Sequence, residues 1–141
     1  MIEFHPISID DFAWAAPIMR SSNYMCCGYS FVTQFMWSHA YNTHIAKYDD
    51  WVLIRSDVGD ACYYLWPAGK SGDERKALEA MERDAERIGR PMYLYSVTLE
   101  AKTQLEEWYP GKFTITSDRA DYDYIYEQAN LAELPGRRFQ K

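Results

Sequence analysis

The sequence predicts an α/β fold of the α+β kind, with a mixed, mostly antiparallel sheet and helices on both faces. Two observations lead to this prediction. Two short turns, Asp49–Asp50 and Asp57–Asp60, separate three β-rich runs in the middle of the chain, a pattern typical of an antiparallel meander. Segments with helical periodicity stand before and after these runs, so we expect helices packed on a central sheet.

The first third of the chain predicts one strand and two helices. Ile2–Pro6 alternates and is short, as in an edge strand that a proline ends. Ser8 and the acids after it are typical of a helix start, because serine caps free backbone N–H groups and carboxylates favour the positive helix end. Pro17 falls inside this helix and should kink or divide it. A second helix is predicted over about Ser30–Ala40.

The remaining elements follow from turns and caps. The meander strands are predicted over Thr43–Tyr48, Trp51–Arg55 and Ala61–Trp66. The helix with the clearest apolar face follows the loop 67–73 and ends at Gly89, because Pro91 blocks its continuation. After it we predict the strand Met92–Val97, a helix from Thr98 to about Trp108, and the strands Lys112–Thr116 and Tyr122–Tyr126.

The composition is that of a globular domain with one core. Hydrophobic residues make up 48% and charged residues 26% of the 141 residues. The formal net charge is −6, and an acidic surface repels phosphate backbones, which disfavours broad nucleic-acid binding. No apolar run is long enough to predict a membrane span, and the N-terminus lacks the pattern of a secretory signal.

The cysteines and histidines predict neither a disulfide framework nor a metal site. Cys26, Cys27 and Cys62 are odd in number and include an adjacent pair, which indicates a reducing compartment and therefore the cytoplasm. The chain has no CxxC or HxxxH pattern, so we predict no zinc site. The three histidines lie on different elements and assemble no catalytic group by spacing, so the catalytic residues are left unassigned.

The order of the predicted elements resembles the acyl-CoA N-acyltransferase fold, known as GNAT-like. In that fold the fourth and fifth strands splay apart, and the acyl donor enters the gap. The resemblance implies that these strands are Ala61–Trp66 and Met92–Val97. A fold does not by itself establish a function.

The end of the chain carries a closer resemblance. Asp121-Tyr-Asp-Tyr-Ile-Tyr126, followed by Leu131-Ala-Glu-Leu-Pro-Gly-Arg-Arg-Phe-Gln-Lys141, resembles the middle of a bacterial family of uncharacterised proteins. That family is related to the C-terminal domain of phosphatidylglycerol lysyltransferase, and its members are similar to two GNAT-like domains in tandem. The resemblance implies that residues 1–129 form an N-terminal lobe and that residues 130–141 begin a linker or the second lobe.

The same resemblance implies an aminoacyl- or acyltransferase. Its donor would be acyl-CoA or aminoacyl-tRNA, and its partners a second lobe and a lipid headgroup. The alternative is a non-catalytic lobe that scaffolds a second domain or binds a small ligand. We also expect residues after about Asn130 to pack poorly without a downstream domain, or to pair with another copy in a homodimer.

Three groups of residues are candidates for binding, and each has a structural alternative. The loop residues Gly69, Lys70, Ser71 and Gly72 stand where GNAT enzymes hold the pyrophosphate of coenzyme A, or they form a strand-to-helix turn capped by Asp73. The second group either lines an aromatic substrate pocket or belongs to the core of the sheet; its residues are Tyr64, Trp66, Tyr93 and Tyr95. The third group either binds the phosphate of a tRNA or of a lipid headgroup, or is a basic turn exposed to solvent; its residues are Arg137, Arg138 and Lys141.

Overall fold

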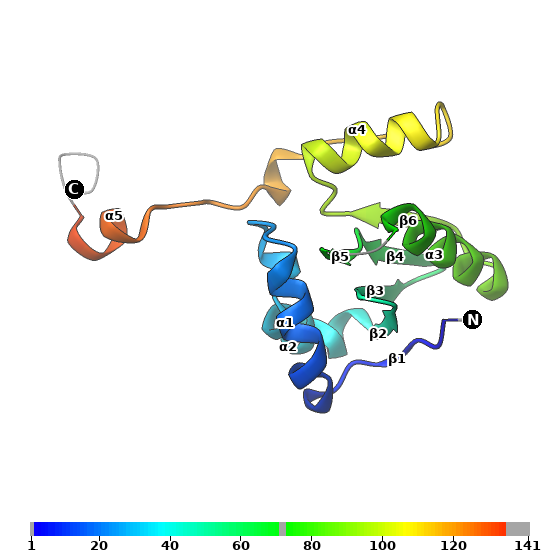
Figure 1. The fold of residues 1–141 in the computed structure, drawn as a ribbon, viewed down its shortest axis with the longest axis horizontal. Coiled ribbons are helices and arrows are strands. Elements are labelled where there is room, and N and C mark those ends of the chain that lie inside the picture. Colours follow the sequence, from blue (N-terminus) through cyan, green and yellow to red (C-terminus); the bar gives the residue numbers. More distant parts are fainter. Residues whose placement is uncertain (1, 71–72, 135–141) are drawn as a thin grey trace.

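A computed structural model describes residues 2–70 and 73–134, which build a six-stranded sheet with helices on both of its faces (Figure 1). The strands are β1 His5–Pro6, β2 Thr43–Tyr48, β3 Trp51–Val58, β4 Ala61–Leu65, β5 Ala68–Gly69 and β6 Met92–Tyr95. The α-helices are α1 Phe12–Ser21, α2 Phe31–Tyr41, α3 Glu74–Ile88, α4 Leu99–Trp108 and α5 Gln128–Glu133. Short 3-10 turns are η1 Ile9–Asp11, η2 Cys27–Tyr29 and η3 Arg119–Asp121.

The predicted meander is confirmed. β2 pairs antiparallel with β3 from Thr43↔Ser56 to Tyr48↔Trp51, and β3 pairs antiparallel with β4 from Arg55↔Tyr64 to Val58↔Ala61. The strand order is β1-β2-β3-β4-β6, and among the strands of the described residues only the β4–β6 pair is parallel. The mixed, mostly antiparallel sheet that the sequence predicts is therefore present.

A β-bulge interrupts the strand that follows the second turn. After β4, the chain rejoins β3 as β5, with Val52 opposite Ala68 and Trp51 opposite Gly69. Between the two ladders, Leu53–Ile54 of β3 faces three residues, Leu65–Pro67, on the other strand. Such bulges bend a strand and often stand beside functional sites. This one contains Trp66, whose indole N–H donates to Glu74 at the start of α3.

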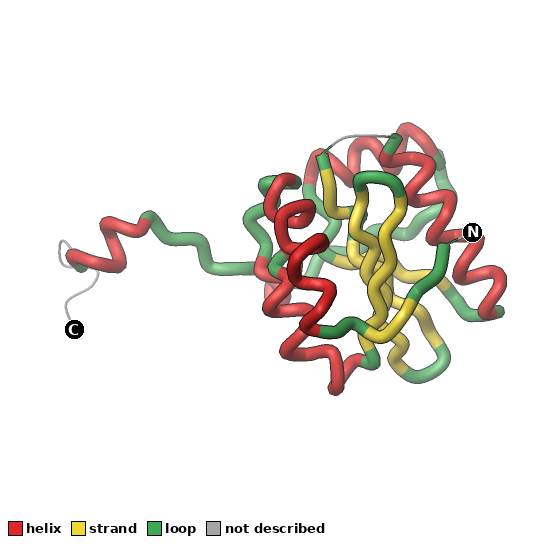
Figure 2. Tube along the Cα trace, turned by 60° about the horizontal axis from the view of Figure 1, so that its bottom comes forward, coloured by secondary structure: helices red, strands yellow, loops and turns green. Residues whose placement is uncertain are grey.

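The two faces of the sheet carry different helices. The Tyr64 hydroxyl donates to Asp84 of α3, so α3 covers the Tyr64 face. Tyr95 lies opposite Leu65, hence on the other face, and its hydroxyl donates to Gln34 of α2. Helix α1 contacts β3 and β5, and α2 contacts β2 and β3. Figure 2 shows the helices flanking the strands.

Helix α3 forms as its sequence predicts. Asp73 caps it by accepting a hydrogen bond from the Lys76 N–H, and Gly89 ends it with φ 72°, a left-handed conformation that glycine adopts without strain. Its inward face buries Leu78, Met81 and Ala85 against the sheet. The prediction of a strand-to-helix turn capped by Asp73 is confirmed.

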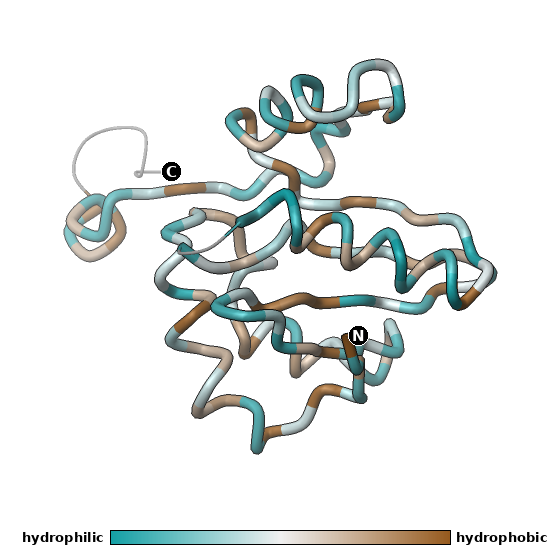
Figure 3. Tube along the Cα trace, turned by 45° about the vertical axis from the view of Figure 1, so that its right-hand side comes forward, coloured by the Kyte–Doolittle hydropathy of each residue, from teal (hydrophilic) through white to brown (hydrophobic). Residues whose placement is uncertain are grey.

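Two predicted strands are wrong. Residues 112–116 and 122–126 are not in a strand, and the second segment runs away from the body toward α5 (Figures 1 and 2). Within the described residues neither segment has a neighbouring strand, and β-propensity without a pairing partner does not make a strand. Figure 3 shows hydrophobic colour along this protruding segment as well as in the body.

Smaller differences concern the N-terminal elements. The first strand is shorter than the predicted Ile2–Pro6, since β1 is only His5–Pro6. Helix α1 runs through Pro17 without being divided. Among the described residues, no helix is both long and apolar enough to cross a membrane.

Candidate functional site

The candidate site lies where β4 and β6 end and α3 begins. The GNAT-like resemblance implies that these two strands splay apart, but they are paired in parallel from Cys62↔Met92 to Leu65↔Tyr95. The Trp66 N–H still donates to the Tyr95 carbonyl at 3.3 Å. The two strands separate after these residues. The segment after β4 passes through the bulge and pairs with β3, and the segment after β6 turns at Ser96, whose φ is 54°.

The α1–α2 loop, residues 22–30, packs into this separation. The Tyr29 hydroxyl donates to the Ser96 carbonyl at 2.8 Å, and Cys26 Sγ lies 3.5 Å from Ser96 Oγ. Gly28 lies so close that a Cβ on it would stand 3.2 Å from Ser96 Oγ and 3.6 Å from a methyl group of Leu65. The loop therefore contacts the ends of both strands directly.

Glu74, the first residue of α3, closes the same region from the other side. Its Oε1 accepts hydrogen bonds from the Trp66 indole N–H at 2.7 Å and from the Tyr24 hydroxyl at 3.4 Å. Trp66 is fully buried, while Glu74 and Tyr24 are half-buried. These three side chains come from the bulge, from α3 and from the α1–α2 loop, and we call them the Glu74 cluster.

The Glu74 cluster is electrostatically unusual. Burial raises the pKa of Glu74, although hydrogen bonds from Trp66 and Tyr24 act in the opposite direction. Burial and the neighbouring Glu74 carboxylate together raise the pKa of Tyr24 to about 12. A helix N-terminus normally attracts anions. Here Asp73 and Glu74 place two carboxylates of the chain itself at that end, so a further anion meets repulsion.

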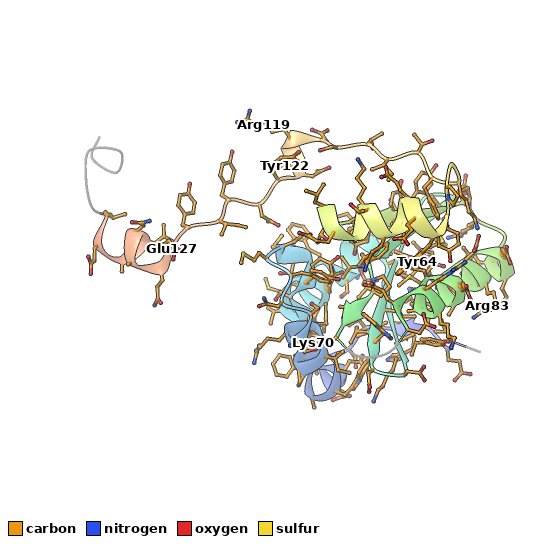
Figure 4. All side chains as sticks on the ribbon, turned by 45° about the horizontal axis from the view of Figure 1, so that its top comes forward. Tyr64, Lys70, Arg83, Arg119, Tyr122 and Glu127 are labelled. Atoms are coloured by element: carbon orange, nitrogen blue, oxygen red, sulfur yellow. The ribbon has the colours of Figure 1, made fainter. Side chains whose placement is uncertain are left out.

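The predicted phosphate loop is only partly described. Gly69 is buried in β5, and a Cβ on it would lie 2.7 Å from both the Asp50 carbonyl and a ring carbon of Trp51. Packing on Trp51 thus accounts for glycine at this position. Lys70 is exposed (Figure 4), and Ser71 and Gly72 lie outside the described residues.

The four aromatic candidates do not meet in one pocket. Tyr64 is buried on the α3 face, where its hydroxyl donates to Asp84, and Trp66 belongs to the Glu74 cluster. Tyr95 lies on the α2 face. Tyr93 is 50% exposed and stacks on Tyr63 with ring centres 5.1 Å apart. The third candidate group, Arg137, Arg138 and Lys141, lies outside the described residues.

Sequence reasoning missed Tyr24 and Glu74. Both are polar residues that long-range contacts bring to the strand ends, across 50 positions of the chain. The available signal is the glutamate placed directly after the capping Asp73, which puts a second carboxylate at a helix start.

Comparison with known proteins places the chain in a family. Residues 20–141 match the family model described as "Phosphatidylglycerol lysyltransferase, C-terminal". The chain belongs to this family. The domain is therefore acyltransferase-like, and the resemblance predicted from its C-terminal motif is confirmed. No curated protein matches the chain.

Two solved structures resemble the chain. A conserved protein of unknown function from Bacteroides thetaiotaomicron is 31% identical to this lysyltransferase-family chain, with a TM-score of 0.92. The match covers 99% of this chain and 47% of the Bacteroides chain. The chain thus spans about half the length of that protein. The PaiA N-acetyltransferase from Thermoplasma acidophilum, solved in complex with coenzyme A, is 16% identical with a TM-score of 0.52. This match covers 86% of the present chain and 95% of the acetyltransferase chain. This second likeness confirms the predicted GNAT-like fold.

Proposed function

We propose that this chain is the supporting lobe of a two-lobe acyl- or aminoacyltransferase, and that it does not itself hold the donor. Membership of the lysyltransferase family supports the reaction class. The twofold length of the Bacteroides protein supports a second lobe, which would carry the chemistry. In this arrangement the chain is the N-terminal lobe, and its role is to position the second one.

The Glu74 cluster is the observation that carries this proposal. In a GNAT-like fold the acyl donor binds beside the helix that corresponds to α3 of this chain. Here the carboxylate of Glu74 accepts hydrogen bonds from Trp66 and Tyr24. The α1–α2 loop also contacts Ser96 and Leu65. A pyrophosphate in this place would have to displace the loop and lie against a carboxylate, which is unfavourable at short range.

A lobe that takes acyl-CoA itself is the second candidate. The coenzyme A bound to the Thermoplasma acetyltransferase favours it, because the two chains share the fold. Donor binding would then require Tyr24 to leave Glu74 and the α1–α2 loop to open. Aminoacyl-tRNA as donor, a lipid headgroup as acceptor and pairing with another copy remain predictions of the resemblance. The free thiols fit the predicted cytoplasmic location.

Coenzyme A titration with a thermal-shift readout separates the two candidates. A ligand that binds only the folded protein at 100 times its Kd adds about 2.7 kcal/mol of stability, which is readily seen as a rise in Tm. We expect no rise for this chain, and a clear rise for the Thermoplasma acetyltransferase as positive control. A saturable rise in this chain would overturn the supporting-lobe proposal.

The Glu74→Gln variant sharpens the titration. It removes the charge but keeps an oxygen for Trp66 and Tyr24. We expect no coenzyme A response here either, because the α1–α2 loop still contacts Ser96 and Leu65. A response confined to the variant would assign the exclusion to the Glu74 charge alone.

A further inference from the structure

We propose that Cys26, Cys27 and Asp123 form a zinc site that fastens the segment after η3 to the α1–α2 loop. The two sulfurs and one carboxylate oxygen all lie within 4.8 Å of one another. The inference does not rest on the proposed function, since it concerns a metal ion and not an acyl donor.

The three ligands come together because the backbone changes conformation between the cysteines. Cys26 is extended, with φ −94° and ψ 138°, while Cys27 begins the turn η2. In a regular strand neighbouring side chains point to opposite sides. Here both sulfurs instead lie within 4.8 Å of each other and of the same Asp123 carboxylate oxygen. The adjacent pair thus acts as a single chelating unit, which a spacing rule such as CxxC does not find.

Further contacts hold the ligands in place. The Cys27 N–H donates to Asp123 Oδ2 at 3.0 Å, across 96 positions of the chain. Cys26 Sγ lies 3.5 Å from Ser96 Oγ, and the Tyr29 hydroxyl fixes the Ser96 carbonyl. Backbone and side-chain partners behind metal ligands fix their orientation and raise the affinity for the ion.

Zinc is the ion that fits these donors. Thiolates are soft ligands that select Zn²⁺ over Mg²⁺ or Ca²⁺, and a carboxylate completes many zinc sites. A tetrahedral site with Zn–S bonds of about 2.3 Å and Zn–O bonds of about 2.0–2.2 Å holds its ligand atoms less far apart than 4.8 Å. The two sulfurs and the carboxylate oxygen lie within 4.8 Å of one another here, so their spacing is compatible with such a site. Cys27 and Asp123 are exposed, so a water molecule can take the fourth position.

Binding releases protons and cross-links the chain. Each sulfur gives its proton to solvent and donates the freed electron pair to the ion, so two protons leave for each zinc bound. The two thiolates and the carboxylate carry three negative charges, which zinc reduces to one. The ion thereby ties the protruding segment to the body at Asp123.

Cobalt titration of the complete 141-residue chain under reducing conditions tests the site. Co²⁺ replaces Zn²⁺ in tetrahedral sites and gives a sulfur-to-cobalt charge-transfer band in the near ultraviolet. We expect one equivalent to produce this band, and Zn²⁺ to abolish it by competition. Amide exchange between residues 121 and 127 should slow when zinc is added, which reports on the cross-link itself.

Three variants decide whether these residues are the ligands. The Cys26→Ser/Cys27→Ser double variant should lose the band, and Asp123→Asn should weaken zinc binding about tenfold or more. Cys62→Ser is the matched control, because Cys62 is buried beside Asp57 and should bind zinc as the wild type does. Circular dichroism checks that each variant is folded.

Two results would overturn the zinc site. One is the absence of the charge-transfer band in the wild-type chain at stoichiometric cobalt. The other is equal zinc affinity in wild type and the folded double variant, which would make the ion adventitious. Unchanged affinity in Asp123→Asn together with unchanged exchange after residue 121 would equally remove the proposed cross-link.

Discussion

The Asp84 carboxylate of α3 accepts a hydrogen bond of 2.7 Å from the Arg55 guanidinium of β3, and both side chains are almost fully buried. The same oxygen accepts the Tyr64 hydroxyl at 2.8 Å, and the other oxygen accepts Arg87 at 2.8 Å. On the far side of the guanidinium lies Asp57. Asp84 is therefore a buried polar link between α3 and the sheet, and α3 in turn positions Glu74.

Asp84→Asn should lower the free energy of unfolding by about 3 kcal/mol. This is the low end of the cost of breaking a buried ion pair, because Asp57 still partners Arg55. Urea denaturation measures the change. Glu79→Gln is the control on the same helix: its pair with Arg75 is exposed, and the variant should lose less than about 1 kcal/mol. Equal losses in the two variants would contradict the role given to Asp84.

Acid should destabilise the domain partly through Asp84. Burial acts to raise the pKa of this carboxyl, but hydrogen bonds from Arg87, Arg55 and Tyr64 outweigh burial and leave the pKa below its ordinary value. A lowered folded-state pKa means that the stabilisation is complete above the unfolded pKa and is lost as pH falls toward the folded one. Urea midpoints measured from neutral pH to about pH 3 should fall less steeply in Asp84→Asn than in wild type. Parallel curves would refute this assignment.

Gly69→Ala distinguishes packing from ligand binding. The added methyl group would lie 2.7 Å from the Asp50 carbonyl and from the Trp51 ring, so we expect a loss of about 1–3 kcal/mol from overpacking. Lys70→Ala, at the exposed neighbouring position, should be nearly neutral. Thermal unfolding of both variants measures this. A fully stable Gly69→Ala protein would remove the packing explanation and revive the phosphate-loop prediction.

Glu74 should tolerate amidation but not truncation. In Glu74→Gln an amide oxygen can still accept the Trp66 N–H, and the cost of desolvating a carboxylate disappears, so the stability at neutral pH should be equal to or above that of wild type. Glu74→Ala leaves the buried indole N–H without an acceptor and should cost about 1–3 kcal/mol. Chemical denaturation of the pair decides between these outcomes. Equal losses in both variants would mean that the Glu74 charge itself is required.

Local patterns in the sequence predict much of the fold. The turn at Asp49–Asp50, the turn predicted over Asp57–Asp60 and observed at Gly59–Asp60, the Asp73 and Thr98 caps and the Gly89 terminus depend on neighbouring residues only, and all are present. The strand predicted over 122–126 failed for the opposite reason. A strand needs a partner, and its sequence does not say whether one is in reach.

The candidate site could be predicted only in part, because its residues meet through long-range packing. Alternation predicts that Tyr64 and Tyr95 fall on opposite faces once the β4–β6 register is known, yet that register joins strands that are distant in the sequence. Glu74 depends on Tyr24 in a distant loop. The pairing of Asp123 with Cys26 and Cys27 likewise depends on how the segment after η3 crosses the body, which no local pattern encodes.

The parallel pairing of β4 with β6 has a consequence for the order of folding. β2, β3 and β4 are joined by tight turns, and such hairpins close in about 1–10 μs. β6 cannot pair until the chain has crossed over through α3, so its ladder carries a larger loop-closure entropy. We expect pulse-labelled refolding to protect the amides of β2 and β3 before those of β6. The strand ends and the Glu74 cluster would then assemble last, and a partner that meets the nascent chain would find this region still open.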